Sequence, residues 1–119
     1  PIGSGDVNDY LREVAGESFT AKDFRTWAAT TLAARTLRRL GPAPTKRAHV
    51  ANVNRALDEV AVRLGNTRAV SRAAYVHPAV LSGYADGSLL AFESGPREIE
   101  GLDDDEWFAL AWLRQAAAA

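Results

Sequence analysis

The sequence contains no cysteine and no methionine, and it has only two histidines, His49 and His77. Without cysteine, the chain can form neither a disulfide framework nor a thiolate metal site. Neither histidine has an acidic neighbour at a spacing that is typical of metal ligands. We therefore expect no metal site and no cofactor in this chain.

Long apolar segments are also absent. No run of eighteen apolar residues exists, and no charged-then-apolar signal segment opens the chain, so we expect no membrane partner. The chain begins with Pro1 and not with methionine, which suggests a processed, truncated or expressed fragment. We predict a cytoplasmic location.

The remaining composition is typical of a globular domain, because 47% of the 119 residues are hydrophobic and 24% are charged. This length fits one domain or part of one. The net charge of −1 hides an asymmetry: residues 1–75 carry twelve basic and seven acidic side chains, whereas residues 76–119 carry two and eight. The basic half permits binding to a polyanion, but ordinary surface charge explains these counts equally well.

Apolar residues recur at three- and four-residue steps through most of the chain, which predicts an all-α fold, a compact multi-helix bundle. The expected helices cover residues 6–14, 21–40, 46–64, 78–87 and about 103–115, with a short helix or turn over 67–75. Residues at their ends favour these boundaries: Thr20 and Thr45 as N-caps, Gly65 as a C-cap, Pro78 in a first turn. In the irregular segment 88–101, only Leu89–Phe92 is acceptable as a strand. Three tryptophans are expected in the core: Trp27, Trp107 and Trp112.

Three features could bind or attack a phosphate, although each also has a plainer explanation. Arg25, in the first turns of its helix, could hold an anion with its planar guanidinium, but pairing with a carboxylate is more common. Residues 65–67 could present donors to a ligand or could simply end a helix. Tyr75 could be a nucleophile, although tyrosines at helix ends usually pack; His77-Pro78 is expected to shape the turn after it. The residues alone leave these alternatives open.

The order and spacing of the three features resemble the type IB DNA topoisomerases of bacteria and poxviruses. Residues 20–28, TAKDFRTWA, resemble the segment that holds the second catalytic arginine. LGNT at 64–67, followed by VSRAAYVHP at 70–78, resembles the active-site tyrosine segment. The resemblance spans roughly residues 4–100. It implies that residues 1–119 are a single partial catalytic domain, the C-terminal portion of the fold shared by these topoisomerases and the tyrosine recombinases.

The resemblance also implies a role for each matching position. Arg25 matches the arginine that contacts the scissile phosphate, and Tyr75 matches the nucleophile. Asn66 falls where poxvirus enzymes have a histidine and bacterial relatives often have asparagine; it can offer only a neutral amide hydrogen bond. The implied reaction relaxes supercoiled double-stranded DNA through a transient 3′-phosphotyrosyl link. Because that link conserves the energy of the broken bond, resealing needs neither ATP nor metal.

Further polar residues are candidates for contacts with DNA phosphates: Lys22, Lys46, Arg47, Thr67, Arg68 and Arg72. For any one of them, a purely solvated surface position is equally plausible.

The family's active site needs parts that this sequence does not match. A further arginine and a general-acid lysine lie upstream of the arginine helix, as does an N-terminal DNA clamp, and only 24 residues precede Arg25 here. We therefore expect the chain to be close to inactive in isolation. We also expect it to be a monomer that is associated with the bacterial nucleoid. Two alternatives stay open: the catalytic core of a tyrosine recombinase or integrase, and a non-catalytic helical DNA-binding module.

Overall fold

The structure is a computed structural model that describes residues 21–118, with side chains from Phe24 onward. The helix expected over 6–14 and the cap expected at Thr20 lie outside the described residues. The observed elements are α2 (Ala21–Leu40), α3 (Lys46–Leu64), α4 (Arg68–Val70), the π-helical turn η1 (Ser71–Tyr75), α5 (Pro78–Asp86), α6 (Ser88–Ala91) and α7 (Asp104–Ala118). Residues 21–118 contain no strand, which confirms the all-α prediction. None of these helices is long and apolar enough to cross a membrane.

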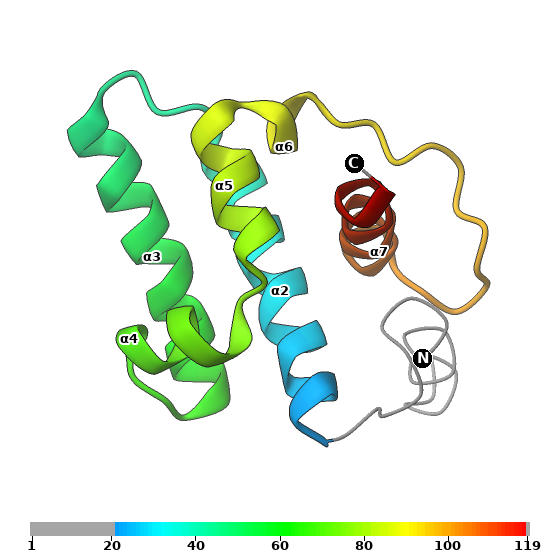
Figure 1. Ribbon diagram of the computed structural model, residues 1–119, viewed down its shortest axis with the longest axis horizontal. Coiled ribbons are helices and arrows are strands. Elements are labelled where there is room, and N and C mark those ends of the chain that lie inside the picture. The colour runs from blue at the N-terminus through cyan, green and yellow to red at the C-terminus, as the bar shows by residue number, and fades with distance from the viewer. Residues whose placement is uncertain (1–20, 119) are drawn as a thin grey trace.

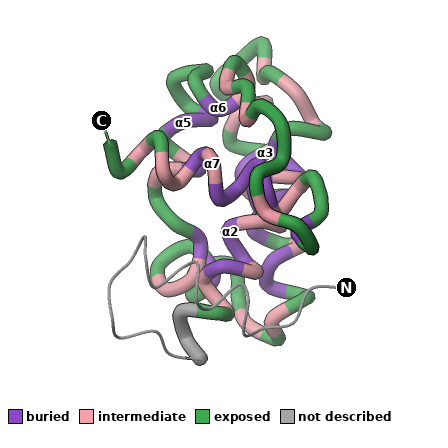
Figure 2. The backbone as a smooth tube through the Cα atoms, turned by 90° about the vertical axis from the view of Figure 1, so that its right-hand side faces the viewer, coloured by how far each residue is buried: buried purple, intermediate pink, exposed green. Residues whose placement is uncertain are grey.

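Helix α2 is the centre of the fold, with α3 on one side of it and α7 on the other (Figure 1). The turn η1 and helix α5 also pack against α2. Buried residues lie where the helices face one another, and exposed residues follow their outer turns and the loops (Figure 2). Because α3, α7, η1 and α5 all pack on α2, its small alanines at positions 29, 33 and 34 are almost completely buried.

Local capping chemistry explains the ends of α3. Thr45 adopts an extended conformation, and its side-chain oxygen accepts a hydrogen bond from the N–H of Ala48 at 3.0 Å. Gly65 has φ 71°, a left-handed conformation that residues with a Cβ rarely adopt, and its N–H bonds the carbonyl of Ala61. Both caps were expected from the sequence, and both are confirmed.

The segment between α3 and α5 turns twice within a few residues. Thr67 caps α4, and the chain then widens into η1, where the N–H of Val76 bonds the carbonyl of Ser71 at 2.9 Å. Short π-helical turns of this kind are rare and often mark functional sites. His77 caps α5 by accepting a hydrogen bond from Ala79 at its Nδ1 atom, and Pro78 follows at the first helical position, as expected.

The C-terminal third differs from the expectation at one point. Leu89–Phe92 is not a strand, because residues 88–91 form the helical turn α6. The carboxylate of Asp86 accepts a hydrogen bond from the N–H of Ser88 at 2.8 Å and starts this turn. No neighbouring strand exists within residues 21–118 to pair with an extended segment, so Leu89 instead turns into the core, where it is fully buried.

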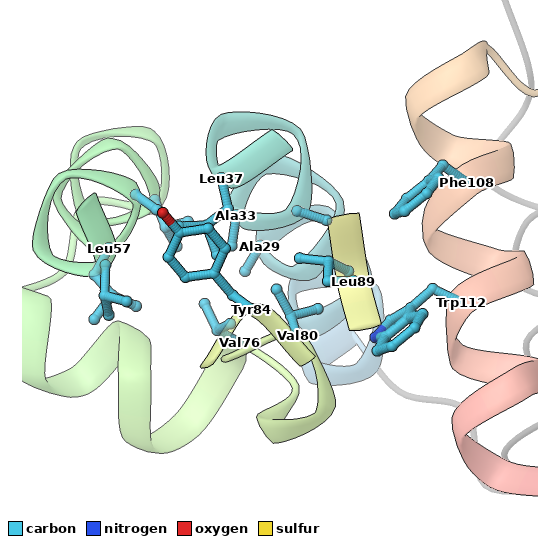
Figure 3. Packing of buried hydrophobic residues seen from close by; sticks show 14 residues of the cluster. Ala29, Ala33, Leu37, Leu57, Val76, Val80, Tyr84, Leu89, Phe108 and Trp112 are labelled. Atoms are coloured by element: carbon cyan, nitrogen blue, oxygen red, sulfur yellow. The ribbon is translucent and has the colours of Figure 1, made fainter. Parts of the chain in front are cut away.

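Helix α7 closes the bundle. It begins with a reciprocal capping box, in which Asp103 accepts from the N–H of Glu106 at 2.8 Å and Glu106 accepts from the N–H of Asp103 at 2.9 Å. It then runs to Ala118, three residues beyond the expected end. Phe108 and Trp112 project from α7 toward Leu89 (Figure 3).

The tryptophans are buried, as the sequence predicted, and one of them sets a tight contact. Trp27, Trp107 and Trp112 are 5%, 4% and 6% exposed. The ring of Trp112 lies so close to Gly83 of α5 that a Cβ there would be 2.4 Å from Cζ2. A glycine at this position therefore allows α5 and α7 to pack together.

Candidate active site

The N-terminal turns of α2, the C-terminal end of α3 and the turn η1 meet at one end of the bundle, the lower part of Figure 1. Arg25, Asn66 and Tyr75 come from these three places. They are separated by up to 50 positions in the sequence, and the tertiary packing brings two of them into direct contact.

Arg25 is the connection between the three elements. Its Nη2 atom donates a hydrogen bond to the carbonyl of Leu64 at 3.0 Å, and its Cζ atom lies 5.2 Å from the centroid of the Tyr75 ring. The Nε atom is buried and has no hydrogen-bond partner among the described residues. A guanidinium has five N–H donors. Arg25 is therefore held in place with donor capacity left over.

Asn66 follows the end of α3 directly. The N–H of Asn66 bonds the carbonyl of Ala61 at 2.9 Å, which together with the Gly65 cap closes the helix in a Schellman-type end. The side-chain Nδ2 atom is buried and makes no hydrogen bond within residues 21–118. Leaving such a donor unsatisfied costs about 1–3 kcal/mol. Asn66 thus has an amide donor that the described part of the fold does not use.

Tyr75 ends the π-helical turn. Its ring is half-buried against the main core cluster, and its hydroxyl has no hydrogen-bond partner among the described residues. The ring face carries the Arg25 guanidinium in a cation–π contact. The ring of Tyr75 is therefore held by packing and by the Arg25 contact, and its hydroxyl makes no hydrogen bond within the described part of the chain.

His77 has a structural role in this arrangement. Its Nδ1 atom accepts a hydrogen bond from the N–H of Ala79 at 3.0 Å, which requires an unprotonated nitrogen. Partial desolvation of the imidazole lowers its pKa, which favours the neutral ring that the cap needs. The structure thus agrees with the expectation that His77-Pro78 shapes the turn after Tyr75.

The six candidate DNA contacts are not gathered in one place. The side chain of Lys22 lies outside the described part of the chain. Lys46 and Arg47 are exposed at the start of α3, about 27 Å along that helix from Leu64. These two residues therefore belong to a different part of the surface from Tyr75.

The other three candidates lie closer to the turn η1. Thr67 uses its hydroxyl oxygen as the N-cap acceptor for Val70 at 3.1 Å. Arg68 pairs with Asp58 of α3 through two hydrogen bonds of 2.7 and 2.8 Å. This pairing raises the pKa of Arg68 and lowers that of Asp58, the hydrogen bond being the larger cause in both. Arg72 is exposed and lines a groove of about 460 Å³ between α3 and α5.

Sequence reasoning missed two buried hydroxyls beside Tyr75. Thr30 is 1% exposed and contacts the backbone on both sides of Val76, and Ser71 is fully buried at the start of η1. The sequence signal that could have indicated Thr30 was its position in the buried stripe of α2, whose other members are mostly alanine and leucine. The Asp58–Arg68 pair left no such signal, because its partners are ten positions apart on different helices.

Within residues 21–118, no group of three or more potential ligands could hold a metal ion.

Comparison with known protein families gives a match over most of the chain. The family described as "Eukaryotic DNA topoisomerase I, catalytic core" matches residues 1–92, which include Arg25, Asn66 and Tyr75. No curated protein matches the chain significantly.

Proposed function

Because the chain belongs to the family of the eukaryotic DNA topoisomerase I catalytic core, we propose that it is part of a type IB DNA topoisomerase whose nucleophile is Tyr75. The observation that carries this proposal is the Arg25 guanidinium, 5.2 Å from the centroid of the Tyr75 ring. A phosphodiester attacked by Tyr75 would lie within reach of an arginine that has unused donors.

The proposed reaction is a reversible transesterification on double-stranded DNA. The Tyr75 Oη atom attacks the scissile phosphorus, its proton leaves, and the bond from phosphorus to the 5′ oxygen breaks. A 3′-phosphotyrosyl link and a 5′-hydroxyl result. The cut strand can then rotate before the 5′-hydroxyl attacks the phosphorus and releases Tyr75. The reaction consumes no ATP and needs no metal, because each step exchanges one phosphate ester for another.

Arg25 and Asn66 would stabilise the transition state. Negative charge grows on the non-bridging oxygens as phosphorus becomes five-coordinate, and a preorganised donor directed at such charge contributes a factor of about 10²–10³ in rate. Arg25 supplies a charged fork, and the free Nδ2 of Asn66 supplies a neutral donor. A proton for the leaving 5′ oxygen must come from elsewhere, since none of the residues matched here is a suitable acid. No residue of this chain matches the family's general-acid lysine or its further arginine.

We propose that Arg68 and Arg72 contact DNA phosphates near the cleavage point, and that Lys46 and Arg47 do so farther along the duplex. The sequences of the arginine and tyrosine segments favour the bacterial and poxvirus branch of the family. We also propose that the protein is a monomer in the bacterial cytoplasm, associated with the nucleoid. We expect the 119 residues alone to relax plasmid DNA very slowly.

The decisive experiment uses a DNA duplex in which the 5′ bridging oxygen of one phosphodiester is replaced by sulfur. A thiolate leaves without a general acid, so this substrate bypasses the expected missing lysine. We expect the chain to form a covalent protein–DNA adduct that survives SDS and that Tyr75→Phe abolishes. Tyr84→Phe is the matched control, because Tyr84 is buried and its hydroxyl bonds the carbonyl of Gly41 at 2.7 Å.

The outcomes separate the alternatives. DNA binding without an adduct, both for this chain and for a version extended upstream, would favour a non-catalytic DNA-binding module. An adduct formed only at a specific recombination site, by an assembly of several chains, would favour a tyrosine recombinase. Relaxation of plasmids of any sequence by the extended protein supports the topoisomerase.

A further inference from the structure

The side chain of Thr30 joins α2 to the backbone that follows the π-helical turn. Its Oγ1 atom accepts a hydrogen bond from the N–H of His77 at 3.1 Å and donates a longer one to the carbonyl of Tyr75 at 3.5 Å. Thr30 is 1% exposed, and Val76, between the two backbone groups, is 4% exposed. A single buried hydroxyl therefore satisfies the backbone on both sides of Val76.

These two backbone groups have no helical partners. Val76 adopts an extended conformation with φ −77° and ψ 123°, so η1 ends at Tyr75 and α5 starts only at Pro78. The N–H of Val76 itself still bonds back to Ser71, but the next N–H reaches across to α2. The path of the chain directly after Tyr75 is thus set by a side chain from another helix.

Helix α2 also contacts the ring of Tyr75. Arg25 lies five residues before Thr30 on α2, and its guanidinium covers the Tyr75 ring. A helix of 20 residues packed between α3 and α7 is a rigid support. Thr30 lies near the middle of this helix. Ring and backbone of Tyr75 are therefore fixed relative to each other by two residues of one element.

We propose that Thr30 is a positioning residue for Tyr75. Its hydroxyl holds the backbone after Tyr75 so that the phenol oxygen faces the site beside Arg25, and it does not itself touch the DNA. This inference rests on the proposed role of Tyr75 as the nucleophile. A displacement of about 1 Å in a reacting group can reduce a rate by about 10²-fold, so a hydroxyl that fixes this backbone has a large effect on cleavage.

The position of Tyr75 can be measured without catalysis, in the chain labelled with 3-fluorotyrosine. The ¹⁹F signal of Tyr75 is assigned by its loss in Tyr75→Phe. We expect Thr30→Val to shift this signal and to speed hydrogen exchange of the His77 amide by about two- to tenfold, the effect of one lost hydrogen bond. Thr30→Ser keeps the hydroxyl and should restore both. Thr30→Ala serves as a second deletion of the hydroxyl should valine disturb the fold.

Thr36→Val is the matched control. Thr36 lies on the same helix, is 2% exposed, and its hydroxyl bonds Glu59 at 2.6 Å, away from Tyr75. We expect it to lower the melting temperature without changing the Tyr75 signal or the His77 exchange. The inference is overturned if the Thr30 variants leave both readouts unchanged, or if Thr36→Val changes them equally.

The rate of adduct formation with the bridging-sulfur substrate is the functional readout. At saturating DNA, Thr30→Val and Thr30→Ala should react about 10- to 100-fold more slowly than the wild type, with an unchanged Kd for DNA and with recovery in Thr30→Ser. Equal rates in all variants would overturn the positioning role. If neither the wild-type chain nor the version extended upstream forms an adduct, the proposed function has failed, and the ¹⁹F and exchange data alone then decide whether Thr30 sets the position of Tyr75.

Discussion

The guanidinium of Arg25 donates a hydrogen bond to the carbonyl of Leu64 and at the same time lies over the ring of Tyr75. The carbonyl belongs to the last turn of α3, where the helix itself supplies no donor. One side chain of α2 thus ties the end of α3 to the residue that we propose as the nucleophile.

Replacement of Arg25 should affect cleavage far more than folding. Arg25→Ala removes the Leu64 hydrogen bond and the cation–π contact, which should cost about 1–2 kcal/mol of unfolding free energy. Adduct formation should fall by about 10²–10³-fold. Arg25→Lys keeps the charge but lacks the planar fork, so we expect an intermediate rate. Arg39→Ala, at an exposed position near the other end of α2, is the control. A rate for Arg25→Ala within threefold of the wild type would contradict the assignment.

Asn66→Ala should slow adduct formation without lowering the stability of the fold. Because the Nδ2 donor is buried without a partner in the described structure, its removal should leave the unfolding free energy unchanged or slightly higher. If the amide binds a non-bridging oxygen, adduct formation should still fall by about tenfold or more. Urea denaturation and the adduct assay measure the two effects. A loss of stability with an unchanged rate would show that Asn66 is only part of the helix end.

Much of the fold follows from local chemistry that is visible in the sequence. Thr45, Gly65 and Pro78 set boundaries through hydrogen bonds and dihedral angles that depend on their immediate neighbours. Leu89 was misjudged because a short apolar run is compatible with a strand or with one helical turn. Whether this run forms a strand or a helical turn depends on the Asp86 cap and on whether another strand is available to pair with it. The availability of a partner strand is a property of the tertiary structure.

The site was predictable to a smaller extent. Arg25, Asn66 and Tyr75 stood out because their order resembles a known family, whereas their chemistry alone favoured ordinary structural roles. The contact between Arg25 and Tyr75 depends on how α2 packs on η1. Thr30 could not be assigned at all, since a buried threonine in a helix can bond any backbone that passes nearby.

Neutralising Asp58 should strengthen DNA binding. Asp58 holds Arg68 through two hydrogen bonds, and Asp58→Asn would leave this arginine free for a phosphate. One additional phosphate contact should steepen the dependence of log Kd on log salt concentration by about 0.9. Fluorescence anisotropy at several salt concentrations measures this slope. Arg68→Gln in the Asp58→Asn background should cancel the gain, and Glu100→Gln, which also removes a negative charge, should not reproduce it. An unchanged slope in Asp58→Asn would show that Arg68 does not contact DNA.

Protonation of His77 should weaken the fold at mildly acidic pH. The folded state lowers the pKa of His77, so between its folded and unfolded pKa values the unfolded chain binds more protons. The stabilisation from the neutral ring is therefore complete above the unfolded value of about 6.5, and it is lost as pH falls through the folded pKa. His77→Asn keeps a side-chain oxygen that can cap α5 but does not titrate. We expect the difference in unfolding free energy between wild type and His77→Asn, measured by urea denaturation from pH 8 to pH 5, to shift in favour of the variant as the pH falls. His49 is present in both proteins and cancels. A difference that is constant across this range would show that the cap does not depend on the protonation state of His77.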